Sequence, residues 1–275
     1  MRFEIVTIFP GFFQSIFEHG IVRRALAEGL VTVGIHDLRN FTHDRHRTVD
    51  DRPFGGGEGM VLKPEPLAEA LASLGIEAKG KLEAGEDSPA GTRVILLSAQ
   101  GRPFTQALAR EIAALDQVVL VCGRYEGVDE RINQLYCDME LSIGDYVLSG
   151  GELAAAVVVD AAMRLIPGVL GNEASGEFES FGVADAEIET DIEGVPRSQH
   201  GAGGLLDYPH YTRPAEFDGL RVPETLLNGD HLQIRRWRRE QQLRKTLANR
   251  PDLLQRAALS EADRKLLESI RLEGR

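Results

Sequence analysis

Four carboxylates lie in or beside two glycine-rich turns near the middle of the chain: Glu126, Asp129, Asp145 and Glu152. The first turn follows an apolar run at residues 118–122, and the second covers residues 141–153. A short aliphatic run is typical of a strand buried on both faces. The glycines that follow it let the backbone approach a ligand closely. Because ligands of open α/β sheets collect at the carboxyl ends of strands, we expect a cofactor at these turns.

The carboxylates limit which cofactor suits the turns. They would repel a polyphosphate, whereas a cationic or neutral ligand with ribose hydroxyls tolerates them. The sequence has no Gly-x-Gly-x-x-Gly after a predicted strand and no Gly-x-x-x-x-Gly-Lys-Ser/Thr phosphate loop. These observations favour a sulfonium nucleoside over a nucleoside triphosphate. Two ordinary β-turns with solvated acids are the alternative.

A second polar segment, residues 40–59, is rich in Arg, His and Asp and ends in four closely spaced glycines. A loop of this length in a compact domain is usually functional or disordered. Its side chains suit hydrogen bonding to a polar substrate, and a dispensable connection is the alternative. His43 and His46 have no cysteine partners, so we interpret them as surface residues and predict no metal site.

The elements that must position these segments alternate along the chain. The hydrophobic pattern predicts strands at residues 3–9, 31–38, 94–97 and 118–121, and helices at 12–29, 64–74, 103–115 and 153–166. The last helix is apolar nearly all round, so we expect it to be covered on most sides. This alternation predicts an α/β fold with a mostly parallel sheet.

Composition narrows the class of protein. The 275 residues are 43% apolar, and no apolar run approaches the roughly 20 residues that span a bilayer. The N-terminal residues do not have the pattern of a signal peptide. Cys122 and Cys137 are the only cysteines, and we expect buried free thiols in a cytoplasmic protein with no membrane partner.

Charge divides the second half of the chain. The net charge is −12, yet residues 231–250 hold seven Arg or Lys and one Glu, whereas residues 171–218 hold eleven acids and two arginines. Such asymmetry is typical of a nucleic-acid-binding face on an otherwise acidic protein. We expect an acidic flexible linker with little core of its own at 168–209 and a small helical domain at 210–275, with helices that begin after Asp230 and Ser260.

Five motifs that are distributed over most of the length of the chain carry a resemblance. They are FTHDRHRTVDDRP at 41–53, CGRYEGVDER at 122–131, SIGDYVLSGGEL at 142–153, IPGVLG at 166–171 and PHYTRP at 209–214. With residues 234–238 (IRRWR), they make the chain similar to the bacterial tRNA (guanine37-N1)-methyltransferases of the knotted (SPOUT-type) methyltransferase superfamily. A chance match to this set is negligible.

The resemblance implies S-adenosylmethionine as cofactor, a deep trefoil knot in the sheet and a homodimer whose active site is shared between chains. It implies methylation of N1 of the guanosine 3′ of the anticodon (position 37) in tRNA, which prevents frameshifting. Residues 1–167 would form the knotted cofactor-binding domain, and residues 210–275 would bind tRNA. It also implies a dependence on magnesium, although the sequence shows no dedicated set of oxygen ligands. By match to the motifs, the cofactor site comprises Leu97, Ser98, Gly123, Tyr125, Glu126, Ile143, Gly144, Asp145, Tyr146, Val147, Leu148, Gly150 and Gly151.

Methylation at N1 requires loss of the N1 proton and stabilisation of the charge that develops on O6. The resemblance assigns the second role to Arg164, the cation on an otherwise apolar helix. Taken alone, that arginine would be expected to interact with helix carbonyls or to snorkel.

The family's general base is an aspartate followed by Ser-Phe, and this chain has Glu179 at that position. Glutamate can remove the same proton but is one methylene longer, and a misplacement of about 1 Å can cost about a hundredfold in rate. Either the backbone compensates, or activity is reduced, or another acid serves, with Asp207 or Glu177 nearest. The chain also departs from shorter family members by an insertion of roughly twenty residues at 182–204, which costs little entropy.

Basic residues of the predicted C-terminal domain are expected to contact RNA phosphates: Arg235, Arg236, Arg238, Arg239, Arg244 and Lys245. The alternative for them is a solvated helix face. For the whole chain, the alternatives are a catalytically weakened RNA-binding homologue and a knotted methyltransferase acting on another RNA. A phosphohydrolase fits least, because no phosphate-binding lysine motif is present.

Overall fold

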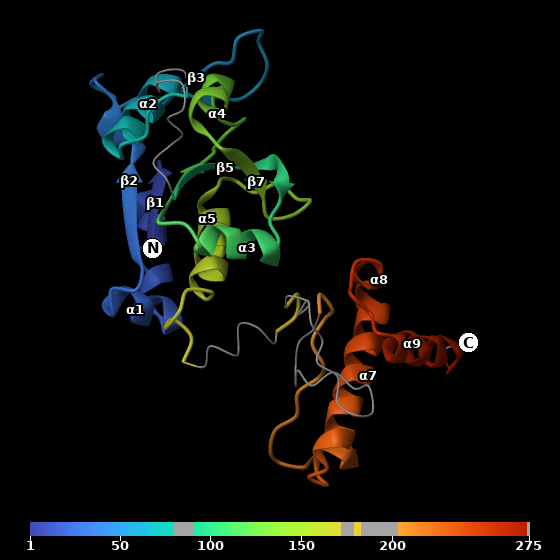
Figure 1. The fold of residues 1–275 in the computed structure, drawn as a ribbon. Helices are drawn as coiled ribbons and strands as arrows, with labels where there is room; N and C mark the ends of the chain where they lie inside the picture. The colour runs from blue at the N-terminus through green and yellow to red at the C-terminus, as the bar shows by residue number, and fades with distance from the viewer. Residues whose placement is uncertain (80–90, 172–178, 183–202, 274–275) are drawn as a thin grey trace. The chain divides into compact units, whose positions relative to one another are not determined.

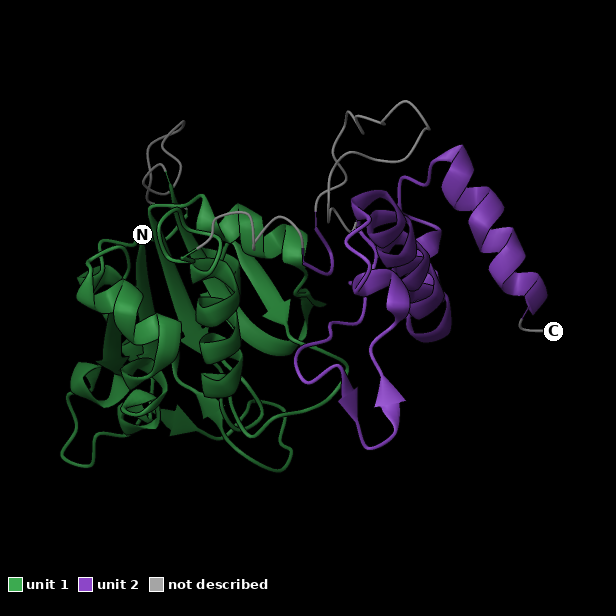
Figure 2. Cartoon of the chain, turned by 90° about the horizontal axis from the view of Figure 1, so that it is seen from below, with its two compact units in different colours: residues 1–171 green, residues 172–275 purple. Residues whose placement is uncertain are grey.

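The computed structural model describes residues 1–79, 91–171, 179–182 and 203–273, and it divides into two compact units. Unit 1 is Met1–Gly171 and unit 2 is Asn172–Arg275 (Figure 2). Among the described residues, no helix is long and apolar enough to cross a membrane.

A parallel five-stranded sheet forms the centre of the described part of unit 1 (Figure 1). Its order is β2 (Thr32–Asp37), β1 (Arg2–Thr7), β6 (Gln117–Cys122), β5 (Thr92–Pro103) and β7 (Met139–Ser142). All four neighbouring pairs are parallel. The predicted α/β class with a mostly parallel sheet is therefore confirmed.

Helices cover both faces of this sheet. The side chains of β6 alternate between two cores, with Val118 and Leu120 in one and Val119 and Val121 in the other. The first core includes residues of α1 (Gly20–Ala27), α3 (Gln106–Ala113) and α5 (Glu152–Met163). The second includes residues of α2 (Pro64–Ser73) and α4 (Glu130–Tyr136). This double coverage is why the strands read as continuous apolar runs.

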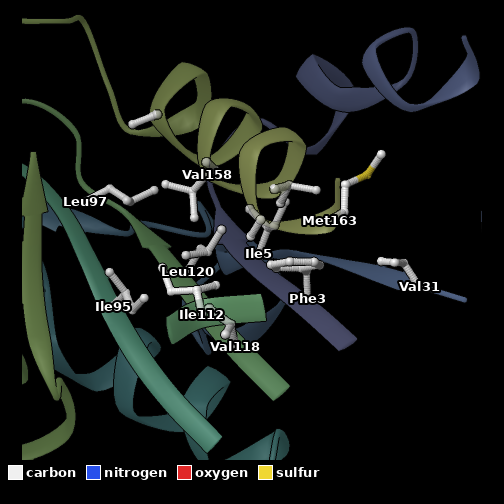
Figure 3. Packing of buried hydrophobic residues seen from close by; sticks show 14 of the residues in the cluster. Phe3, Ile5, Val31, Ile95, Leu97, Ile112, Val118, Leu120, Val158 and Met163 are labelled. Atoms are coloured by element: carbon white, nitrogen blue, oxygen red, sulfur yellow. The ribbon is translucent and has the colours of Figure 1, made fainter. Parts of the chain in front are cut away.

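Helix α5 packs its apolar side chains onto the strands. Figure 3 shows Val158 projecting from α5 toward the layer that contains Ile5 and Leu120, and Met163 of the same helix belongs to the same buried cluster. In the single chain, however, Leu153 is 48% and Val157 44% exposed. The prediction of a helix covered on most sides is confirmed, and the exposed side chains are confined to one face.

Short elements complete unit 1. A two-stranded ladder joins β3 (Asp50–Asp51) to β4 (Val61–Leu62) in antiparallel fashion. Single turns of 3₁₀ helix form η1 (Pro10–Phe13), η2 (Ile16–Glu18) and η3 (Leu38–Phe41). The predicted helix at 12–29 is therefore broken, with Gly20 at φ +61° where α1 begins.

Unit 2 contains helices α7 (His231–Asn249), α8 (Pro251–Leu254) and α9 (Glu261–Glu273). Asp230 caps α7 by accepting hydrogen bonds from the Leu232 and Gln233 amides. A hairpin of β8 (Glu216–Phe217) and β9 (Leu220–Arg221) precedes the single turn η4 (Glu224–Leu226).

The expected linker at 168–209 carries buried residues at both of its described ends. Val169 belongs to the core of unit 1, and Leu205 to the core of unit 2 with Leu243 and Leu267. Each described end therefore packs into the core of the unit to which it belongs, and the linker expected between them stays a prediction.

Candidate functional site

A pocket of about 490 Å³ lies at the carboxyl ends of three neighbouring strands, β6, β5 and β7. Its walls come from residues 96–100 after the first part of β5, from 123–130 after β6, and from the segment that leads from β7 into α5. The two glycine-rich turns thus meet at one edge of the sheet, as the position of strand ends in a parallel sheet requires.

Twelve of the thirteen predicted cofactor residues line this pocket. They are Leu97, Ser98, Gly123, Tyr125, Glu126, Ile143, Gly144, Tyr146, Val147, Leu148, Gly150 and Gly151. Asp145 is not among the lining residues. The sequence interpretation missed Arg124, Gln100 and Glu140, which also line it.

An irregularity in β5 places Gln100, one of the residues that the sequence did not predict, in the pocket wall. Leu141 of β7 pairs with Leu97 and again with Arg102, so residues 98–101 bulge out of the ladder. A Cβ at Gly101 would collide with the backbone of Leu141. This glycine, four residues after the apolar run 94–97 ends, is the signal that could have indicated a bulge.

The glycines of the second turn allow close backbone contact with the first. The Gly151 amide donates to the Gly123 carbonyl at 2.9 Å. A Cβ at Gly151 would lie 2.7 Å from Cys122 Cα, which is backbone and cannot move aside easily. The two turns are therefore held edge to edge in a way that a larger residue would disturb.

The end of the long polar loop packs against the first turn. The Glu126 amide donates to the Met60 carbonyl, and the Leu62 amide donates to the Gly127 carbonyl, both at 3.0 Å. The Asp129 amide bonds back to Leu62 at 3.1 Å. The predicted substrate loop is thereby attached to the pocket wall.

A buried ion pair stands next to the pocket. Glu152 is 1% exposed, and its Oε2 lies 3.1 Å from Nη2 of Arg124, which lines the pocket. Thr7 donates its hydroxyl to Glu152 Oε1 at 2.7 Å. The Arg124 guanidinium also lies 4.6 Å from the centre of the Phe9 ring. Burial raises the pKa of the neighbouring Cys122 thiol, and the negative charge of Glu152 raises it further.

The two predicted catalytic residues belong to different units. Arg164 is half-buried at the C-cap of α5 in unit 1. Glu179 is half-buried in unit 2 and lies in a short described segment, 179–182. The surroundings of Arg164 are therefore those of unit 1, and the surroundings of Glu179 are those of unit 2.

The segment that contains Glu179 is tied to residues 203–208. Phe181 donates its amide to the Leu205 carbonyl at 3.0 Å, and the Asp207 amide donates to Ser180 Oγ at 2.9 Å. The Gly204 amide donates to the Gly182 carbonyl at 2.9 Å, which joins the two described ends of the segment 182–204. Asp207, the alternative base, has its Oδ2 3.0 Å from His210 Nε2. Glu177, the other alternative, lies outside the described residues.

The expected RNA-contacting cations are not equivalent. Arg236 and Lys245 are exposed on α7. Arg239, in contrast, donates to Asp263 at 2.7 and 2.8 Å and is 14% exposed, so the structure assigns it to an ion pair between α7 and α9. Arg244 bonds Glu240 and Glu273. Arg239 is therefore held by Asp263, of which its sequence neighbourhood gives no sign, and contact of these cations with phosphate stays a prediction.

The remaining predictions concern thiols and metals. Cys122 and Cys137 are free and buried, as expected. Across the part of the chain that the structure describes, no group of three or more His, Cys, Asp or Glu side chains is arranged to hold a metal ion.

Comparison with known proteins gives a consistent result over the whole chain. The family model described as tRNA (Guanine-1)-methyltransferase TrmD matches residues 1–256. A tRNA (guanine-N(1)-)-methyltransferase of Koribacter versatilis is 55% identical over 98% of this chain and 98% of its own length. Proteins of the same name from Dehalococcoides mccartyi and Geobacter sulfurreducens are 47% and 46% identical, over 99% and 100% of this chain and 98% and 99% of their own lengths.

Proposed function

The chain belongs to the tRNA (guanine-1)-methyltransferase family, and on that premise we propose that it transfers a methyl group from S-adenosylmethionine to N1 of guanosine 37 in tRNA. The observation that carries the proposal is the full-length similarity to relatives named for this activity. We add that the sheet of unit 1 is threaded as a trefoil knot and that the enzyme works in the cytoplasm, where its tRNA substrate is found.

The pocket of unit 1 suits the cofactor. Its walls combine the close-packed glycine backbones with the rings of Tyr125 and Tyr146, which are 51% and 55% exposed. Such a site offers main-chain donors and acceptors to a nucleoside and apolar surface to its base. When bound, S-adenosylmethionine supplies an electrophilic methyl group. Of the thirteen predicted residues, the twelve that line the pocket would hold it. No step is assigned to magnesium, because no group of three or more His, Cys, Asp or Glu side chains among the described residues is arranged to hold a metal ion.

In our proposal, one side chain accepts the proton that the guanine loses, and a second stabilises the negative charge that develops on it. Glu179 removes the N1 proton of the guanine, and Arg164 stabilises the negative charge that accumulates on O6. The ties from residues 180–182 to 204–207 support this role for Glu179, because they hold the backbone next to it in a defined conformation.

We propose a homodimer in which each active site takes residues from both chains. The exposed apolar side chains of Leu153 and Val157 on α5 support a partner for this face. Unit 2 would bind tRNA through exposed cations of α7, so affinity would fall with salt. Sedimentation at increasing protein concentration tests the dimer.

Transfer of tritiated methyl groups to tRNA tests the function. We expect labelling of tRNA with guanosine at position 37 and none when adenosine, which lacks O6 and the N1 proton, replaces it. Equal labelling of both would overturn the assignment. Glu179→Gln should slow transfer by about a hundredfold or more while binding of S-adenosylmethionine persists. If Glu179→Gln keeps full activity, another acid must be the general base. The activity of Asp207→Asn, measured beside it, then tests whether that acid is Asp207.

A further inference from the structure

Glu152 is a buried acid that the proposed reaction does not use. It begins α5, does not line the pocket and is 1% exposed. Burying a carboxylate is costly unless it is paired and hydrogen-bonded, and replacing a buried pair with apolar residues is often neutral or stabilising. The pair is therefore better explained by what it positions than by the stability it adds.

Glu152 and its two partners come from three segments that are far apart in sequence. Thr7 ends β1, Arg124 belongs to the turn after β6, and Glu152 follows the second glycine-rich turn. Arg124 and Gly150 also form an antiparallel bridge. The carboxylate thus links the sheet to both turns that form the pocket.

Gly150 of the second turn packs so closely against the ion pair that no side chain could be accommodated at this position. A Cβ at Gly150 would collide with the Arg124 side chain and would lie 2.6 Å from Glu152 Oε2. The main chain of the pocket wall therefore rests directly on the buried pair. A shift of either charged group would displace the backbone that faces the ligand.

We propose that Glu152 is a positioning residue for cofactor binding: acting through Arg124 and Thr7, its carboxylate fixes the 123–127 turn against the 149–151 turn. This inference rests on the proposed function, because the pocket is taken to hold S-adenosylmethionine. A site whose backbone is fixed before binding loses less conformational freedom when the ligand enters. Without the carboxylate, the Arg124 cation, 19% exposed, and the Thr7 hydroxyl would both lack their partner.

Calorimetric titration of S-adenosylmethionine into the full chain tests the proposal. Glu152→Gln keeps the shape of the side chain and removes its charge, so we expect the dissociation constant to rise about tenfold or more. The KM for the cofactor should rise in parallel, whereas the KM for tRNA stays within about twofold. Thr7→Val removes the hydroxyl that donates to Glu152 and accepts from the Phe9 amide, and it should raise the dissociation constant about threefold.

Asp263→Asn is the matched control. Asp263 is paired with Arg239 and is 3% exposed, close to the 2% of the Glu152 side chain, but it lies in unit 2. This variant should lower the melting temperature and leave the affinity for S-adenosylmethionine unchanged. If it weakens cofactor binding as much as Glu152→Gln does, general destabilisation explains both, and the positioning role is overturned.

The outcomes separate the inference from the function on which it rests. If the wild type binds and both Glu152→Gln and Thr7→Val bind equally well, the pair is only structural and the inference fails. If Glu152→Gln does not fold, the dissociation constant of Thr7→Val for S-adenosylmethionine decides whether the inference holds. If the wild type binds no S-adenosylmethionine, the proposed function itself fails.

Discussion

The Arg124–Glu152 pair of unit 1 and the Arg239–Asp263 pair of unit 2 are almost equally buried, yet they hold different kinds of structure. The first joins a strand end, a turn and a helix start beside a pocket. The second joins two helices, and Asp263 also accepts from the Ser260 amide at the start of α9. The same chemistry supports a site in one unit and helix packing in the other.

The hydrophobic cores of the two units also differ, and unit 1 has the larger one. Unit 1 buries two clusters on opposite faces of its sheet, whereas the described cluster of unit 2 has five buried residues. Unit 1 therefore has a rigid frame on which loops can be positioned, and unit 2 depends more on individual contacts. A substitution should therefore affect mainly the unit in which it lies.

Truncation of core leucines should give the largest effect. Leu120 is fully buried in unit 1 and Leu243 in unit 2, so Leu120→Ala and Leu243→Ala should each cost about 2–5 kcal/mol of unfolding free energy. We expect each to shift the calorimetric transition of its own unit. If both variants shift one common transition equally, the two units unfold together as one cooperative body.

Asp263→Asn should follow, with a loss of about 3 kcal/mol in unit 2, because Arg239 would stay buried without its partner. Burial alone would raise the pKa of Asp263, but the hydrogen bond and charge of Arg239 outweigh it and lower the pKa. The pair therefore stabilises unit 2 above about pH 4, and its contribution is lost as pH falls through the lower folded-state pKa. Acid titration of helicity should show this loss in the wild type and not in Asp263→Asn.

Gly151→Ala should weaken binding of S-adenosylmethionine about tenfold, equivalent to about 1.4 kcal/mol, because the added methyl meets the Cys122 backbone. Gly11→Ala is the control in the same unit, since a Cβ there meets nothing within 4 Å. Titration calorimetry of both variants measures the difference. Equal affinity in Gly151→Ala and Gly11→Ala would show that the contact between the turns does not shape the pocket.

The smallest effect concerns thiol reactivity. Both cysteines lie in unit 1, and burial raises the pKa of Cys122 and raises that of Cys137 to about 12. At about pH 8 the native protein should react with an aromatic disulfide only as unit 1 opens, because the thiolate is the reacting form. Asp263→Asn should leave this rate unchanged. A faster rate would reveal that unit 2 controls opening of unit 1.

Much of the fold of unit 1 followed from pattern alone. The run at 118–121 alternates between two cores, so its aliphatic residues indicated a strand covered on both faces. Helix α4 was not predicted, because its seven residues present one fully buried side chain, Ile132, and have no clear periodicity. The extension of β5 past Leu97 was missed because its later residues are polar and exposed.

The pocket could be predicted because glycine spacing and strand ends are local features. The Glu152 network could not, because Thr7 and Glu152 are 145 residues apart and no periodicity connects them. Arg239 shows the same limit in unit 2, where a run of basic residues conceals one buried ion pair. Local sequence indicates where a turn lies, and only tertiary structure shows which charge supports it.

A crystal structure of the chain with S-adenosylhomocysteine bound would test the central claim most directly. Our account predicts the nucleoside between the turns that contain Gly123, Gly144 and Gly150, with hydrogen bonds to their main chain and with the Arg124–Glu152 pair intact beside it. A ligand bound elsewhere, with these turns unchanged and without contact to it, would contradict the account.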